Sequence, residues 1–203
     1  MTSRAVVNIT GTQEFDITEG DLTIDPDGTF NQGNGHIIYS ADGTQCIGGM
    51  TYNELTIEGS GAKQLCGNIT VTDFFRIFEE SPTLSLDVTS NNYSITLNCD
   101  WENTGDFIPR DGTVTLNGSD INISTDDHGA ETFNDLVVQT SNVLTLMDKT
   151  SVAGTLTMDG GNIDAGSDTL SVGTGSSSPG SITRNSGTVT GNLQRWIENT
   201  GNT

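Results

Sequence analysis

The segment Thr155–Gly175, TLTMDGGNIDAGSDTLSVGTG, consists of short alternating runs that are separated by Gly, Asp and Ser. It shows no helical period and no cluster of charges. Alternation over four or five residues places the apolar side chains on one face of a strand, and Gly and Asp favour tight turns. The segment therefore predicts several short strands joined by turns, with no compact centre of its own.

Strands of this kind recur along the whole chain. Pairs of apolar residues separated by one residue begin 20, 20, 19, 22 and 20 residues apart, at Leu55/Ile57, Phe75/Ile77, Ile95/Leu97, Val114/Leu116, Leu136/Val138 and Leu156/Met158. A second, less regular set lies between them, at Ile69/Val71, Leu86/Val88, Ile121/Ile123, Leu144/Leu146 and Ile163. Two or three short strands in twenty-odd residues are typical of one coil of a parallel β-solenoid.

We therefore predict an all-β protein, a right-handed parallel β-solenoid with coils of about 20 residues. An antiparallel β-sandwich is the alternative, because it also has short strands at regular turns, but it gives no reason for a constant step. Two longer matches are both offset by 81 residues: TYNELTI (51–57) with TFNDLVV (132–138), and VTDFFRI (71–77) with VAGTLTM (152–158). They predict a larger repeat of four coils.

The domain organisation follows from the same pattern. We expect one module over residues 1–203, with residues 1–26 as an N-terminal edge or cap and residues 27–203 as repeats. An open solenoid exposes strand edges and needs caps. The segment GNLQRWIENTGNT (191–203) has no such cap and continues the strand pattern, which indicates a fragment of a longer repetitive chain.

The composition excludes some classes of partner. Seven basic residues stand against 27 acidic ones, and the formal net charge is -20. Such a surface repels the phosphate backbone, so nucleic-acid binding is not expected. No stretch is apolar for long enough to cross a bilayer, so direct membrane insertion is not expected either.

The cysteines indicate a cross-link between coils rather than a metal site. Cys46, Cys66 and Cys99 include no CxxC pair, and the chain has only two His, so a zinc site is poorly supported. Cys46 and Cys66 lie 20 residues apart, at roughly equivalent places on adjacent coils. A disulfide between them and a pair of stacked buried thiols are both consistent with this spacing.

The sequence TDDHG at 125–129 is the cluster that most resembles a catalytic site. Asp126, Asp127 and His128 are candidate catalytic residues, because β-helix polysaccharide hydrolases that resemble polygalacturonases use paired aspartates near a histidine as acid and base. The Asn-x-Asp, Gly-His-Gly and Arg-x-Lys elements of that family are not found in order. An exposed turn between two coils is therefore the favoured interpretation.

Other clusters suggest calcium or sugar. Asp25 and Asp27 in DPDG are candidate calcium ligands, as are the carboxylates of MDGGNIDAGSD (158–168), although turn chemistry alone explains both. We expect no resident cofactor, and calcium is the one candidate ion. Trp101 and Trp196 could stack on sugars, but filling or capping the coil interior is the favoured role.

Several of these motifs resemble the strand-repeat regions of large bacterial cell-surface, adhesin-like secreted proteins, often exported by the type IX route. The motifs are DGTFNQGNGHIIYS (27–40), DWENTGDFIPRDGTVTLNG (100–118), TFNDLVV (132–138), VAGTLTMDGGNIDAGSDTLSVG (152–173) and GSITRNSGTVTGNLQRWI (180–197). The resemblance covers most of the chain from about Asp27 onward and carries no catalytic residues. It implies an extracellular or cell-surface location and a structural or adhesive role.

The leading expectation is a non-enzymatic stalk or display scaffold whose loops contact glycans or other surface-protein subunits. The first alternative is a carbohydrate-active β-helix enzyme or a phage-type tail-fibre segment with a cleft across several coils. The second alternative is a self-assembling filament or sheath subunit, which shares the fold and differs in its end-to-end packing.

Overall fold

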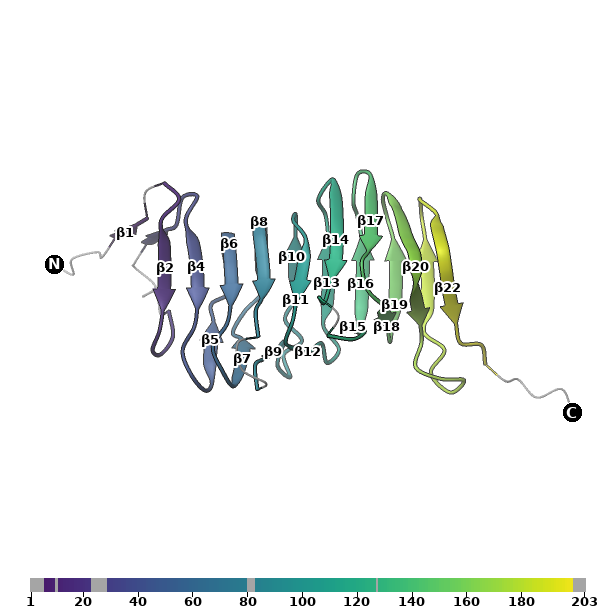
Figure 1. The fold of residues 1–203 in the computed structure, drawn as a ribbon, viewed down its shortest axis with the longest axis horizontal. Coiled ribbons are helices and arrows are strands. Elements are labelled where there is room, and N and C mark those ends of the chain that lie inside the picture. The colour runs from purple at the N-terminus through teal and green to yellow at the C-terminus, as the bar shows by residue number, and fades with distance from the viewer. Residues whose placement is uncertain (1–5, 10, 23–28, 80–82, 127, 199–203) are drawn as a thin grey trace, which may run out of the picture.

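The computed structural model describes residues 6–9, 11–22, 29–79, 83–126 and 128–198. These residues form strands and turns with no helix, and the strands stack in parallel as a β-solenoid of about 8 turns. Figure 1 shows the strands side by side along the long axis, with β2 (Glu14–Ile17) near one end and β22 (Val189–Arg195) at the other. The all-β parallel solenoid predicted from the sequence is thus confirmed.

Each coil passes through three faces, which we number in the order in which the chain visits them. The first face stacks β2, β4 (His36–Tyr39), the end of β6 (Thr51–Ile57), the end of β8 (Ile69–Ile77), β11 (Trp101–Asn103), β14 (Asp120–Ser124), β17 (Val143–Leu146), the start of β20 (Asn162–Val172) and the start of β22. Every one of these pairings is parallel.

The second face consists of two separate stacks. One contains β5 (Gln45–Ile47), β7 (Ala62–Leu65), β9 (Ser85–Asp87) and β12 (Asp106–Ile108). The other contains β15 (Glu131–Phe133), β18 (Thr150–Val152) and the ends of β20 and β22. No ladder joins β12 to β15 in the described part of the chain.

The third face stacks the starts of β6 and β8 with β10 (Ile95–Leu97), β13 (Thr113–Leu116), β16 (Asp135–Val138), β19 (Thr155–Met158) and β21 (Ser181–Arg184). Nearer the N-terminus, β1 (Val6–Asn8) and β3 (Thr29–Asn31) form a parallel pair of their own.

Alternation within each strand creates the core, because every second side chain points inward. Along the third face, one inward row is Ile69, Ile95, Val114, Leu136, Leu156 and Ile182. All but the last of these are buried at 2% exposure or less. Full burial of one such side chain contributes about 1.5–3 kcal/mol, so the row supplies a continuous apolar spine that no coil could form alone.

The six evenly spaced apolar pairs do not form one ladder. This corrects the expectation that their constant step marks equivalent strands of successive coils. The first two doublets lie on the first face, and the other four lie on the third face. Ile95 pairs with Ile69 rather than with Phe75, so the step of 20 residues from Phe75 stops one face short of a full coil. The turns of this coil are longer, and Thr89 and Asn92 adopt positive φ in one of them.

The larger repeat of 81 residues is likewise not a repeat of the structure. Leu55 in TYNELTI lies on the first face and pairs with Phe75, whereas Leu136 in TFNDLVV lies on the third face and pairs with Val114. The two copies of the motif therefore form different corners of the solenoid. The physical reason is that both corners need the same pattern, a polar bend followed by two inward apolar residues.

Polar side chains tie the turns of neighbouring coils together. Asn142 Nδ2 donates to Asp120 Oδ1 at 2.6 Å, and Asn122 Nδ2 donates to Asp100 Oδ2 at 3.2 Å. Lys63 is fully buried, and its Nζ donates to the backbone carbonyls of Ala41, Ser60 and Gly43. Burial lowers the pKa of this ammonium group below its usual value. Asn and Asp side chains thus link neighbouring coils by hydrogen bonds at the surface.

Candidate functional site

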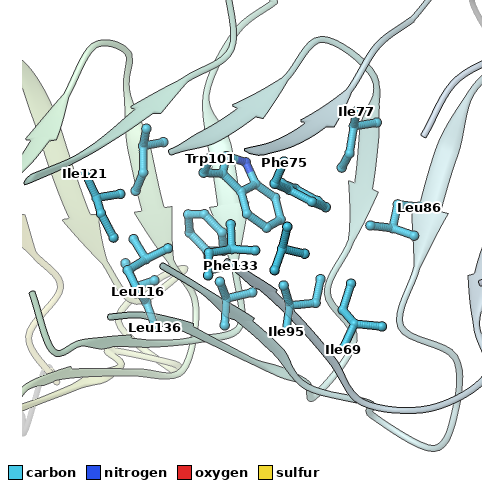
Figure 2. Close-up of a cluster of buried hydrophobic side chains, with 14 of the residues drawn as sticks. Ile69, Phe75, Ile77, Leu86, Ile95, Trp101, Leu116, Ile121, Phe133 and Leu136 are labelled. Atoms are coloured by element: carbon cyan, nitrogen blue, oxygen red, sulfur yellow. The ribbon is translucent and has the colours of Figure 1, made fainter. Parts of the chain in front are cut away.

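The break in the second face, between β12 and β15, is the main irregularity of the solenoid. An aromatic cluster fills the interior at this level: the Trp101 ring centroid lies 5.2 Å from that of Phe75, 4.9 Å from that of Phe107 and 5.0 Å from that of Phe133. Figure 2 shows Trp101, Phe75 and Phe133 among the buried aliphatic side chains. These large rings fill the interior at the level where no ladder joins β12 to β15.

A buried carboxyl group lies against this cluster. Glu131 on β15 accepts hydrogen bonds from Trp101 Nε1 at 2.6 Å and from Asn103 Nδ2 at 2.8 Å through Oε2. Its Oε1 accepts a bond from the backbone N–H of Thr132 at 2.8 Å. Burial raises the pKa of the Glu131 carboxyl, and the hydrogen bonds from Asn103 and Trp101 oppose that effect. The three donors satisfy a polar group that the core could not otherwise hold.

Sequence reasoning missed Glu131, although a signal was present. Glu131 and Phe133 alternate around Thr132, and the structure buries both at the inward positions of β15. The alternation alone could have placed the glutamate inward. Only the fold shows which donors, from a coil about 30 residues earlier, meet it there.

The described residues of TDDHG, 125–126 and 128–129, lie between β14 and β15. The backbone N–H of His128 donates to the Thr125 carbonyl at 3.0 Å, and Asp126 has a positive φ of 53°. His128 Nδ1 lies 3.4 Å from Glu79 Oε2, in a turn two coils earlier. Asp127 lies outside the described residues. The turn is therefore fastened to its neighbours, and its histidine faces a carboxylate.

Three shallow cavities follow the corner between the first and second faces. One of about 240 Å³ is lined by Asn103, His128 and Glu131, among others. One of about 270 Å³ is lined by Arg76, Glu102, Asn103, Ser124 and Asp126. The third, of about 470 Å³, lies farther along, over Asp148, Lys149 and Asp168. The corner thus offers carboxylates, an amide, an imidazole and hydroxyls along several coils.

The side chains at this corner form a row of hydrogen-bond donors and acceptors. His128 is half exposed and paired with Glu79, and Arg76 Nε lies 3.6 Å from Glu102 Oε2. Such a row of donors and acceptors matches the hydroxyl groups of a polysaccharide or the polar edge of another protein. We call the residues Arg76, Glu79, Glu102, Asn103, Asp126 and His128 the corner site.

Of the calcium candidates, only those of the segment 158–168 lie among the described residues. Asp25 and Asp27 lie outside the described residues. In the segment 158–168, Asp164 Oδ1 accepts a bond from the backbone N–H of Gly166 at 3.0 Å, as an Asp in a turn does. Among the residues that the structure describes, no three His, Cys, Asp or Glu side chains gather closely enough to hold a metal ion.

Cys46 and Cys66 form a disulfide with a Cα–Cα distance of 5.7 Å. Cys46 is half-buried and Cys66 is exposed, so the alternative of stacked buried thiols is not what the structure shows. Cys46 pairs in register with Gln64, which places the bond diagonally across two neighbouring coils on the outer surface. Cys99 is free, and burial raises the pKa of its thiol to about 12.

The two tryptophans lie in different environments. Trp101 is fully buried at the centre of the aromatic cluster, which corrects its use in a sugar-stacking platform and agrees with the interior role. Trp196 follows β22 and is 42% exposed.

Comparison of the chain with protein-family models, curated proteins and solved structures finds no match. The described residues contain no helix that is long and apolar enough to span a membrane.

Proposed function

We propose that this chain is a non-enzymatic spacer and display module of a secreted bacterial cell-surface protein. The observation that carries the proposal is the unbroken first face, in which parallel strands stack from β2 to β22. Repeat stacking gives length and rigidity in one direction, since each coil contacts its neighbours and needs no central globule. A stalk requires these mechanical properties.

Two further features support an extracellular setting. The Cys46–Cys66 disulfide lies at the surface, and such bonds persist in oxidising environments outside the cell. The net charge of -20 keeps a long exposed surface soluble and discourages non-specific contact. The sequence resemblance to strand-repeat regions of adhesin-like proteins has the same implication.

In this proposal the corner site is the surface that is displayed. Its turns vary in length from coil to coil, with residues 104–105 linking β11 to β12 and residues 125–130 linking β14 to β15. Loops on a rigid scaffold are where binding residues concentrate. We propose glycans, or the loops of another surface subunit, as the partners of this corner.

The first test is a panel of polysaccharides and a glycan array, each with calcium and with chelator. A display module releases no new reducing ends, whereas a carbohydrate-active enzyme does; release would overturn the proposal. If the array shows binding, the variant His128→Ala with Glu79→Gln should lose it. The control His36→Ala should retain it, because the hydrogen bond and ring contact of His36 go to Thr56 and Phe74, which are not corner-site residues.

The second test addresses location. The protein is isolated from its own cells under conditions that trap free thiols, and Cys46 and Cys66 are examined by mass spectrometry. The proposal expects the disulfide and one alkylated cysteine, Cys99. A protein with three alkylated cysteines would contradict an extracellular role.

A further inference from the structure

The three cavities at the corner between the first and second faces form one continuous groove. The cavities of about 270 Å³ and about 240 Å³ share Asn103 as a lining residue. The second of these shares Gly129 and Ala130 with the cavity of about 470 Å³. The lining residues lie in, or shortly after, five strands that are neighbours on the first face: β8, β11, β14, β17 and β20. We call this continuous hollow the corner groove.

The corner groove runs along the axis of the solenoid. Figure 1 shows the five strands in the same order along the long axis of the molecule. Neighbouring strands of a sheet lie about 4.7–4.9 Å apart, so five strands give the groove a length of about 19 Å. A sugar residue in an extended polysaccharide covers about the same distance as one coil. Such a chain can therefore place one residue over each strand.

One end of the corner groove contains a hydrogen-bond donor that the described residues leave unpaired. Arg76 Nε is buried, and none of these residues accepts a hydrogen bond from it. Glu102 Oε2 lies 3.6 Å from it, beyond the distance of a good hydrogen bond. The Arg76 guanidinium is fixed over the Phe78 ring, 4.3 Å from its centroid. Buried donors in folded proteins are normally paired, so the position between Arg76 and Glu102 suits a hydroxyl group, which accepts from one and donates to the other.

The middle of the corner groove has a wall of buried polar side chains. Asn103, Thr125 and Glu131 line it and are 3%, 3% and 4% exposed. Asn103 Nδ2 donates to Glu131 Oε2 at 2.8 Å, and Thr125 Oγ1 donates to the Gly129 carbonyl at 2.9 Å. The partly buried ring of Phe107 lines the same part of the groove. Side chains that are already fixed lose little freedom when a ligand binds, and an aromatic ring beside polar groups is suited to a sugar.

The charge and composition of the corner groove favour a neutral glycan over other partners. Carboxyl groups outnumber the amino and guanidinium groups of its described lining residues: Glu102, Asp106, Asp126, Glu131, Asp148 and Asp168 against Arg76 and Lys149. An acidic polymer is therefore repelled. Phe107 is the one aromatic side chain among these described residues, whereas protein interfaces depend on aromatic and apolar anchors. A polymer of uncharged units that carry hydroxyl groups meets both conditions.

We propose that the corner groove binds one linear, uncharged polysaccharide chain along the solenoid axis, over about five sugar residues. One hydroxyl group lies between Arg76 Nε and Glu102 Oε2, and the far end of the bound segment reaches Asp168. This inference deepens the proposed display role and rests on it, because it takes the corner site as the start of the binding surface. It adds the class of ligand, the direction of the bound chain and its length.

The test is isothermal titration calorimetry of the full chain with linear oligosaccharides of glucose, mannose and xylose, each from the disaccharide to the hexasaccharide. We expect one series to bind, with an affinity that rises with length up to about the pentasaccharide. The affinity should not change with salt, because the ligand carries no charge. Glu102→Ala and Asp168→Ala, at opposite ends of the groove, should each weaken binding of the hexasaccharide about tenfold. The control Asp120→Ala removes a carboxylate from the other end of β14 and should bind like the natural protein.

Several results would overturn the inference. These are no binding by any series, an affinity that is already maximal with the disaccharide, and a hexasaccharide that binds both variants as tightly as the natural protein. Binding of polygalacturonate alone would contradict the neutral ligand, and binding of a lysine oligomer alone would indicate a protein partner instead. No sugar binding together with an intact disulfide in the thiol experiment would leave the spacer role standing without this ligand. Release of reducing ends from a bound oligosaccharide would instead preserve the groove and refute the non-enzymatic role.

Discussion

The substitution Trp101→Phe tests whether the aromatic cluster holds the solenoid together at the break in the second face. Trp101 is fully buried and donates to Glu131 Oε2 at 2.6 Å. Loss of a hydrogen bond to a buried carboxyl group costs about 1–3 kcal/mol. The smaller ring leaves a cavity of roughly 40 Å³, which adds about 1 kcal/mol at the usual cost per unit volume. We therefore expect the free energy of unfolding to fall by about 2–4 kcal/mol.

The assay is urea unfolding in dilute solution, followed by far-ultraviolet circular dichroism, with Trp196→Phe as the matched control. Trp196 is 42% exposed, and its replacement should change the free energy of unfolding by less than about 0.5 kcal/mol. A double-mutant cycle with Glu131→Leu, which removes the acceptor, isolates the hydrogen bond, and we expect a coupling energy of about 1 kcal/mol or more. Additive effects, or a loss for Trp101→Phe below about 1 kcal/mol, would refute this account of the cluster.

The pH dependence gives an independent check on Glu131. Burial raises the pKa of this carboxyl in the folded state above the ordinary 4.5, so the folded chain binds the proton more tightly than the unfolded chain does. The contribution of Glu131 to stability is therefore greatest below pH 4.5 and declines as pH rises through the folded-state pKa. Glu131→Gln should remove that decline; an unchanged pH profile would contradict the assignment.

Three more substitutions test other parts of the fold. Replacing both Cys46 and Cys66 by Ser should cost about 3 kcal/mol, because the disulfide closes a loop of about 20 residues in the unfolded chain; equal melting temperatures for the variant and the oxidised protein would contradict this. The Arg110 guanidinium lies 2.5 Å from Asp87 and holds the pKa of that carboxyl below its ordinary 3.8. The natural protein should therefore lose stability as the pH falls below 3.8, and Asp87→Asn should reduce that loss. An equally steep loss of stability in the variant would argue against the ion pair. Gly61→Ala should destabilise the chain by about 1–3 kcal/mol, because Gly61 has a φ of 78° and a Cβ would lie 2.7 Å from the backbone of Gly43 in the preceding coil. An unchanged stability in urea unfolding would refute that.

Short-range pattern was enough to predict the coil but not the face on which each strand lies. Alternation in Leu55/Ile57 or Val114/Leu116 predicts strands with one buried side, and the structure confirms those strands. The face on which a strand lies depends on the lengths of the turns before it. The coil from Ile69 to Ile95 takes 26 residues, whereas the next coil, from Ile95 to Val114, takes only 19. Turn length is a property of loops that the apolar pattern does not encode.

Contacts between distant coils were also beyond the sequence. Glu131 meets Trp101 of the neighbouring coil, and His128 meets Glu79 two coils earlier; nothing in the local sequence marks either partner. Arg184 illustrates a different limit. Its strand reads as a continuation of the repeat, and only the register with Met158 shows that a charge has replaced an inward apolar residue.

The break between β12 and β15 has a mechanical consequence. At every other level from β7 to β20 the described coils are joined by three parallel ladders, but at this level by two, so fewer backbone hydrogen bonds resist opening along one side. A rod under lateral load bends where its cross-section is weakest. We expect the solenoid to bend at this level, about the intact first and third faces, where the aromatic cluster fills the interior.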